Sequence, residues 1–220
     1  MVTTRAGLVQ ASTALALTVF FLASCGGPAT IDLPADPIDR AATCGVVAAA
    51  SARTRTEISA SLPLEAQGRI LHHALLAASA SGEFKADVAK AVNARMAALQ
   101  DRITKGKWQD LAAPCESAYP AAGKTEISLP EGKLDAQLQC EELADFVVTA
   151  LEGEESKYGN ALGEFGRMRR QVNDALAAGL NARAGRDLAA QQKARRKALA
   201  AASGLGSPIA ALDACVKRFP

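Results

Sequence analysis

The chain has 220 residues, of which 22% are charged and 4% are aromatic. It contains 25 Lys and Arg residues against 23 Asp and Glu residues, so the formal net charge is only +2 and gives no case for a nucleic-acid partner. Alanine, the best helix former, is abundant, and the length suits one or two small domains. Composition therefore favours closely packed helices and argues against nucleic-acid binding.

The N-terminal segment has the pattern of an export signal. A single basic residue, Arg5, precedes a stretch from Ala6 to Leu22 that has no charged residue. This stretch is shorter than the about 20 apolar residues of a membrane-spanning helix, and no anchoring residues follow it. It therefore predicts the apolar core of a signal peptide and not a stable span.

The signal ends in the residues Leu22-Ala23-Ser24-Cys25. An aliphatic residue, two small residues and a cysteine resemble the lipobox of bacterial lipoproteins, a resemblance that covers only these positions and the segment before them. It implies that the signal peptide, residues 1–24, is removed and that Cys25 becomes a first residue carrying fatty acids such as palmitate. Two acyl chains anchor a protein stably to a membrane. The alternative is an ordinary secretory signal followed by a coincidental cysteine.

The resemblance also implies a location in the bacterial cell envelope. The protein is expected to face the periplasm and to be held at a membrane by its lipid anchor. Gly26 differs from the aspartate associated with inner-membrane retention, so the outer membrane is favoured if the cell is Gram-negative. Residues 25–35 are expected to form the membrane tether.

The remainder of the chain contains an internal repeat. Three blocks recur, the first at an offset of 96 positions and the other two at an offset of 100. The matched blocks are Ile31-x-Leu33-Pro34 with Ile127-x-Leu129-Pro130, Asp87-Val88-Ala89 with Asp187-Leu188-Ala189, and Cys115-x-x-x-Tyr119-Pro120 with Cys215-x-x-x-Phe219-Pro220. The pattern predicts an all-α protein with two tandem repeats, residues 36–120 and 134–220, joined by a linker at residues 121–133.

Each repeat is expected to form a small unit resembling a four-helix bundle, because caps, prolines and apolar spacings divide it into four segments. In the first unit the expected helices run from Pro37 toward Ser59, from Pro63 to about Gly82, from Phe84 to Thr104, and from Trp108 to Tyr119 with a disturbance at Pro114. In the second unit the expected starts are Leu134, Asn160, about Ala182, and Ser207-Pro208.

Four of the five cysteines lie in these repeats, and four thiols in an exported body suggest two disulfides with three possible pairings. In an up-down-up-down bundle the start of the first helix and the end of the last helix lie at the same end. The topology therefore predicts the pairs Cys44–Cys115 and Cys140–Cys215. Closing each loop is worth about 4 kcal/mol in the chain-entropy model.

His72 and His73 are the only histidines. Adjacent residues on a helix point about 100° apart, so the two rings do not converge on one metal ion, and surface or partly buried positions are expected. Trp108 is expected to cover the end of the first core, with a ligand platform as the alternative.

The repeated pairs Asp87 with Arg95 and Asp187 with Arg195 are expected to maintain the fold. The two members of each pair lie about 12 Å apart along a helix, which is too far for a direct salt bridge. An aspartate in the first turn of a helix is favoured by the helix dipole.

Charge is uneven within the second unit, which is acidic in its first helix and basic afterwards. One interpretation is that the acidic helix packs beside basic neighbours; the other is a basic face for anionic lipid or an acidic envelope protein. The basic residues lack interleaved aromatic residues, which speaks against nucleic acid. The possible ligand-binding residues are Trp108, Arg167, Arg169, Arg170, Arg195, Arg196 and Lys197.

The sequence contains no motif of a known catalytic site, so no catalytic residue, metal site or cofactor is predicted. The paired carboxylates Glu141-Glu142 and Glu154-Glu155 are expected to be neighbours on helix surfaces.

Together these features predict an envelope-anchored lipoprotein that serves as a helical binding or structural module. Two alternatives remain. One is an envelope enzyme with a site between the units that uses Trp108, His72 or His73. The other is a module that binds anionic lipid through the second unit.

Overall fold

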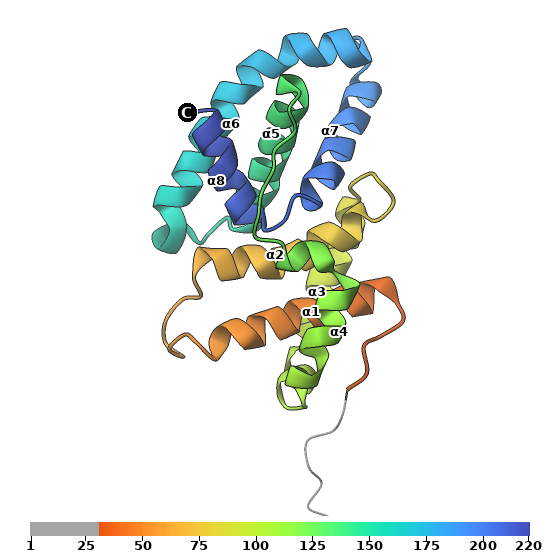
Figure 1. Cartoon of the computed structure of the whole chain (residues 1–220), viewed down its shortest axis with the longest axis vertical. Helices are drawn as coiled ribbons and strands as arrows, with labels where there is room; N and C mark the ends of the chain where they lie inside the picture. The colour runs from red at the N-terminus through yellow and green to blue at the C-terminus, as the bar shows by residue number, and fades with distance from the viewer. Residues whose placement is uncertain (1–30) are drawn as a thin grey trace, which may run out of the picture.

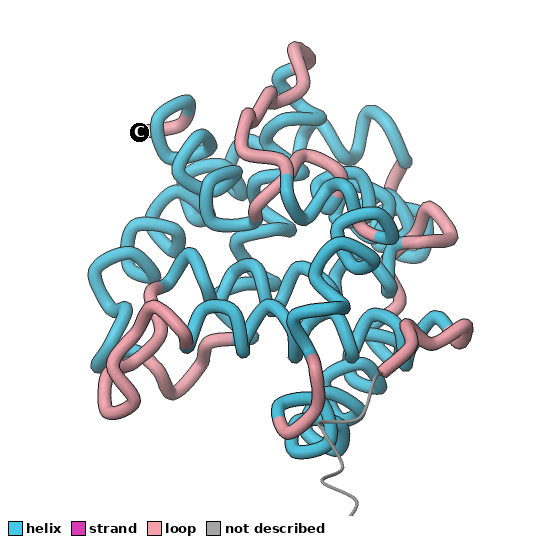
Figure 2. Tube along the Cα trace, turned by 60° about the horizontal axis from the view of Figure 1, so that its bottom comes forward, coloured by secondary structure: helices cyan, strands magenta, loops and turns pink. Residues whose placement is uncertain are grey.

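The computed structural model describes residues 31–220, apart from the side chain of Asp174. The predicted signal peptide, the lipid acceptor Cys25 and the first part of the tether lie outside the described residues. Over residues 31–220 every regular element is a helix, which confirms the all-α class (Figures 1 and 2).

The first unit consists of three long helices followed by short helical turns. Its elements are α1 (Pro37–Arg53), α2 (Leu64–Ser79), α3 (Ala86–Thr104), the 3-10 helix η1 (Trp108–Leu111), α4 (Ala112–Ala118) and the 3-10 helix η2 (Pro120–Gly123). The second unit has four helices, of which α6 is the longest. They are α5 (Lys133–Ala150), α6 (Glu155–Ala184), α7 (Leu188–Ser203) and α8 (Pro208–Arg218).

Helix α1 begins where the sequence predicts but ends earlier. The Asp36 carboxylate accepts hydrogen bonds from the backbone N–H groups of Ile38 and Asp39, at 3.0 and 2.9 Å, and so caps the helix. The helix stops at Arg53 instead of continuing toward Ser59. The hydroxyl of Thr56 donates to the carbonyl of Ala52, which satisfies a carbonyl that helix continuation would otherwise use.

Helix α6 is longer than predicted, which displaces the next helix. The predicted starts were Asn160 and about Ala182, whereas α6 runs over residues 155–184 and α7 begins at Leu188. Gly185 adopts a φ of +69°, a conformation that side chains disfavour, and it terminates α6. The Asp187 carboxylate then caps α7 by accepting from the N–H of Ala189 at 2.9 Å.

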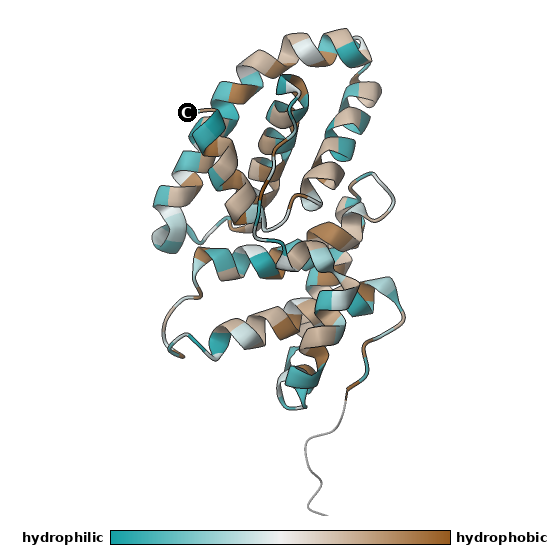
Figure 3. Cartoon of the chain, in the orientation of Figure 1, coloured by the Kyte–Doolittle hydropathy of each residue, from teal (hydrophilic) through white to brown (hydrophobic). Residues whose placement is uncertain are grey.

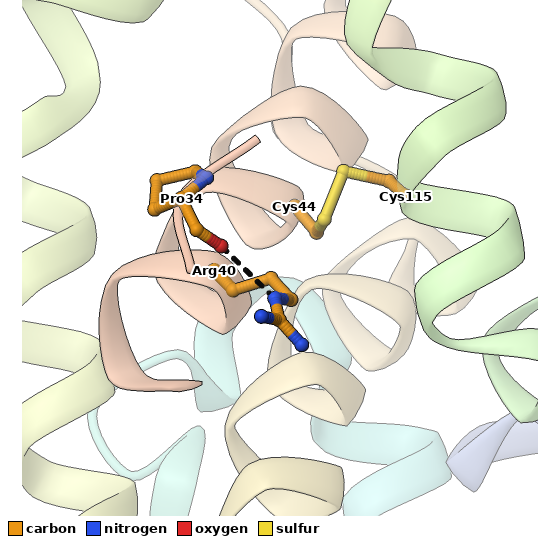
Figure 4. The surroundings of a disulfide bond; sticks show 4 residues. All are labelled: Pro34, Arg40, Cys44 and Cys115. Atoms are coloured by element: carbon orange, nitrogen blue, oxygen red, sulfur yellow. Dashed lines mark hydrogen bonds between the residues drawn. A yellow bond between two sulfur atoms is a disulfide. The ribbon is translucent and has the colours of Figure 1, made fainter. Parts of the chain in front are cut away.

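Both predicted disulfides are present. Cys44–Cys115 joins α1 to α4 with a Cα–Cα distance of 5.4 Å (Figure 4). Cys140–Cys215 joins α5 to α8 with a Cα–Cα distance of 5.7 Å. All four cysteines are buried. Each bond thus ties the first helix of a unit to its last. The duplication of the units itself stays a prediction from the sequence.

An irregular segment precedes the first helix of each unit and packs along that unit. Ile31 and Leu33 contact the core of the first unit, and Ile127 and Leu129 contact the core of the second. We call residues 31–35 and 124–130 the first and second straps. Residues 31–35 at the end of the predicted tether and residues 124–130 of the predicted linker thus pack against a core through alternate apolar side chains.

Arginine side chains hold both straps in place. Arg40 donates to the carbonyls of Pro34 and Ala35 at 2.9 and 2.7 Å (Figure 4). Arg218 donates to the carbonyls of Pro130 and Glu131 at 2.6 and 3.0 Å. In both cases a guanidinium satisfies carbonyl groups that have no helical partner.

The two units share a packed interface centred on α2. In Figure 1 the helices of the second unit stand on α2, which lies across their lower ends. Leu75 of α2 belongs to the core of the second unit, and α2 contacts both α7 and α8. The hydroxyl of Tyr158 donates to the carbonyl of Leu62 at 2.5 Å, and that of Ser207 donates to Glu65 at 2.5 Å. The units are therefore joined by a common core as well as by the chain.

Within residues 31–220, no single helix is long and apolar enough to cross a membrane. Helices α7 and α8 reach that length and composition only as a pair, which is bent by 112°. Figure 3 shows that hydrophilic residues recur along the long α6.

The interface depends on a glycine in α2. A Cβ atom added at Gly68 lies 2.4 Å from Cγ1 of Ile209 in α8, well inside van der Waals contact. We expect Gly68→Ala to lower the free energy of unfolding by about 1–3 kcal/mol despite the better helix propensity of alanine. Urea unfolding checks this.

Gly159→Ala is the matched control, because Gly159 lies inside α6 and an added Cβ meets no atom within 4 Å. This variant is expected to be as stable as the native protein or more stable. Equal stability gains in both variants would contradict the close α2–α8 contact.

Candidate ligand-binding site

A groove of 320 Å³ opens at the junction of the two units. We call it the inter-unit groove. The first unit contributes residues at the start of α3 and just before it, and the second contributes residues of α5 and α7. The lining residues are Phe84, Ala86, Ala89, Lys90, Asn93, Glu142, Asp145, Phe146, Thr149, Ala150, Arg196 and Leu199.

Two phenylalanines give the groove its apolar character. The rings of Phe84 and Phe146 meet edge to face, with centroids 5.7 Å apart and planes at 76°. The backbone N–H of Phe84 donates to the carbonyl of Arg196 at 3.1 Å, which fixes the loop before α3 against α7. An edge-to-face pair adds stability beyond the area that it buries. The apolar wall of the groove is therefore built across both units and held from both sides.

A network of carboxylates and guanidinium groups lies along α5 beside the groove. Arg195 of α7 donates to Glu141 and, at 2.6 Å, to Glu142. Arg169 of α6 forms salt bridges with Asp145 at 2.7 Å and with Glu141 at 3.6 Å. We call these five residues the α5 carboxylate cluster. It joins three helices of the second unit through charge-assisted hydrogen bonds.

Burial changes the protonation of this cluster. Burial in the first place, and the hydrogen bond with Glu141 in the second, raise the pKa of Glu142 to about 8, although Arg195 lowers it. At neutral pH the Glu142 carboxyl group is therefore largely protonated and uncharged. Protonation of Glu142 reduces the repulsion between the neighbouring carboxyl groups of the cluster.

The prediction that Glu141 and Glu142 are surface neighbours is wrong. Glu141 is only 4% exposed. The signal that could have revealed this is its spacing, three residues after the buried Leu138 and three before the buried Ala144, which places it on the core-facing side of α5. Arg195 compensates for its burial, and such a long-range partner is not visible in the local sequence.

The histidine prediction is also wrong, since His72 is 0% exposed and His73 is 6% exposed. Helix α2 is covered by both units, so the side chains of His72 and His73, which point about 100° apart, both face protein. The Nε2 atom of His72 lies 2.7 Å from the carbonyl oxygen of Ser203 in the second unit. The ring of His73 points edge-on to Tyr119 in the first unit, with centroids 5.3 Å apart. Burial lowers the pKa of both rings, that of His73 to about 4.

Most of the predicted ligand-binding residues do not come together at the groove. Trp108 packs, partly buried, against the core of the first unit. Among the predicted basic residues only Arg196 lines the groove, where it lies 3.7 Å from Glu83 of the first unit. Arg169 and Arg195 pair with carboxylates of α5. This agrees with the interpretation that the acidic helix packs beside basic neighbours. Arg167 pairs with Glu164 at 3.9 Å, and Arg170 and Lys197 are exposed.

The repeated aspartates and arginines occupy structural positions. Asp87 lies in the first turn of α3, and Asp187 caps α7. Arg95 forms a bidentate pair with Asp39 of α1, at 2.6 and 3.1 Å. Each arginine thus binds a carboxylate on the first helix of its own unit, as Arg195 does on α5.

No protein-family model, curated protein or solved structure matches the chain. Over residues 31–220, no group of three or more His, Cys, Asp or Glu residues is placed to hold a metal ion. The geometry therefore defines a mainly apolar groove between two units, bordered by charges that are largely paired with one another.

The raised pKa of Glu142 gives a pH prediction. The pKa of Glu142 is about 8 in the folded protein and near 4.5 when unfolded. The folded state therefore binds more protons between these values, and stability from this group is complete below pH 4.5 and is lost as pH rises through 8. Glu142→Gln, which cannot ionise, is expected to gain stability relative to the native protein as pH rises from about 5 to about 8.

Urea unfolding at a series of pH values measures this difference. Glu152→Gln, at an exposed position after α5, is the control and should show no such trend. A constant stability difference between Glu142→Gln and the native protein over this range would show that Glu142 is ionised in the folded state.

Proposed function

We propose that the protein is a lipid-anchored envelope lipoprotein that acts as a helical binding module, with the inter-unit groove as its binding surface. The lipobox-like residues ending in Cys25 support the anchor. The two disulfides support an oxidising compartment, such as the periplasm, because they are rare in the cytosol. The outer membrane is the proposed location if the cell is Gram-negative.

The observation that carries the binding role is the groove itself. It is a concave, mainly apolar site at the junction of two rigidly packed units, which is where ligand sites commonly occur. Its Phe84–Phe146 wall offers an aromatic surface for an apolar side chain of a partner. We propose an envelope protein as the partner, with an apolar segment entering the groove and polar groups meeting Lys90 and Asn93 at its edge.

The charges beside the groove favour binding over catalysis. Asp145 is neutralised by Arg169, and Glu142 is hydrogen-bonded to Arg195. None of the three residues of the alternative enzyme hypothesis, Trp108, His72 and His73, lines the groove. The α5 carboxylates that line the groove are thus already paired with arginine side chains.

The anionic-lipid alternative has less support. It requires free cations on the second unit, but Arg169 and Arg195 are bound to α5, and Arg196 lies close to Glu83. Of the predicted basic residues, only Arg170 and Lys197 are exposed without a salt bridge in the described part of the chain, and two cations give only weak attraction to a charged membrane surface.

We also propose that the two units arose by duplication. In each unit a strap with the pattern Ile-x-Leu-Pro precedes the first helix, and a disulfide joins that helix to the last. The groove then lies between two copies, each of which contributes different residues to it.

In-cell photocrosslinking tests the binding surface. A photoreactive residue at Asn93 in the first unit or at Thr149 in the second, both exposed and lining the groove, is expected to capture the same envelope protein. Lys105, an exposed position beyond α3 and away from the groove lining, is the control. Capture of the same proteins from all three positions, or of none from the groove, would contradict the proposal.

Metabolic labelling with a fatty acid tests the anchor. Native protein is expected to incorporate the label and to sediment with membranes, whereas Cys25→Ala is expected to do neither, because the thioether acceptor is lost. Ser24→Ala keeps a small residue before the cysteine and should label like the native protein. The anchor proposal fails if native protein takes up no fatty acid while Cys25→Ala still sediments with membranes.

A further inference from the structure

A second, smaller cavity lies in the first unit, beside the Cys44–Cys115 disulfide. It has a volume of 190 Å³ and is bordered by α1, α2, α4 and η2. None of its lining residues lines the inter-unit groove. The volume equals that of about six water molecules, so it suits a small molecule and is too small for a peptide segment. We call it the disulfide pocket.

A buried histidine without a full set of partners lines this pocket. His73 is 6% exposed, and its Nδ1 atom has no hydrogen-bond partner among the described residues. Unpaired buried polar atoms are rare in folded proteins and call for an explanation. Burial lowers the pKa of His73 to about 4, so at neutral pH the ring is uncharged and offers one donor and one acceptor. Tyr119, also in the lining, holds the ring edge-on.

Opposite charges border the same pocket. Arg69 lies one helical turn before His73 on α2, and Glu116 lies on α4. Both are exposed, and neither forms a salt bridge with a residue in the described part of the chain. Most of the remaining wall is small and apolar and includes Val47. The pocket therefore combines one cation, one anion, a neutral imidazole and an apolar wall.

We propose that the disulfide pocket binds a small zwitterion, an α-amino acid with a short apolar side chain. Its carboxylate pairs with Arg69, its ammonium group pairs with Glu116, and its side chain packs on Val47. The ring of His73, packed against Tyr119, forms part of the wall that the ligand contacts. This site is separate from the inter-unit groove and does not depend on the function proposed for that groove.

Three matched probes test the charge pattern: valine, isovalerate, which lacks the amine, and isobutylamine, which lacks the carboxylate. Binding to the full chain in detergent is followed by NMR through the ring signals of His73 and Tyr119. Valine is expected to shift these signals saturably and to bind about tenfold more tightly than either partial probe, because each charge pair contributes.

Two variants assign the charges. Arg69→Gln is expected to weaken valine and isovalerate about tenfold and to leave isobutylamine unchanged, and Glu116→Gln is expected to weaken valine and isobutylamine but not isovalerate. Both residues are exposed, so the variants retain the fold, which circular dichroism checks. Lys90→Gln in the inter-unit groove is the control and should bind valine like the native protein.

The proposal is overturned if valine gives no saturable shift at His73, if isovalerate binds as tightly as valine, or if neither variant changes the affinity for valine. Because the disulfide pocket and the inter-unit groove share no lining residue, failure to capture an envelope protein at Asn93 and Thr149 does not affect the valine-binding result. The two proposals therefore fail separately.

Discussion

Helix α2 is covered by protein on two sides, and this double burial organises the molecule. On one side it packs with α1 and α3 in the first unit, and on the other it meets α7 and α8. Its close approach to α8 requires a residue without a side chain at Gly68. The apolar area removed from water on both sides provides the main driving force that holds the units together. The inter-unit groove lies at the edge of this interface.

Several polar residues near the interface are buried and bonded to other parts of the protein. A histidine, two glutamates and an arginine are withdrawn from water there, and each loses hydration that must be replaced. His72 lies against the Ser203 carbonyl, and Arg195 binds both Glu141 and Glu142. These contacts connect helices that are far apart in the sequence, so they also fix which helices are neighbours.

Local chemistry allowed much of the fold to be predicted. Asp36 with Pro37 and Ser207 with Pro208 marked helix starts correctly, because caps act locally. The expected up-down order of the helices predicted both disulfides, because it places the start of the first helix and the end of the last at the same end of a unit. The burial of His72, His73 and Glu141 was not predicted, since it depends on a second unit covering α2 and on Arg195 reaching α5. The inter-unit groove was anticipated only as a cleft, and its lining residues Phe84 and Phe146 were not identified, because their contact joins distant segments.

The second strap has a consequence for motion. Residues 124–130 run along the second unit. Arg218 donates to the carbonyl of Pro130, and the backbone N–H of Ser207 donates to the carbonyl of Lys124 at 3.4 Å. Because this connection is packed along its length, it cannot act as a flexible hinge. The two units are therefore expected to tumble together in solution as one rigid body. The walls of the inter-unit groove, which come from both units, are then expected to keep a fixed orientation relative to each other.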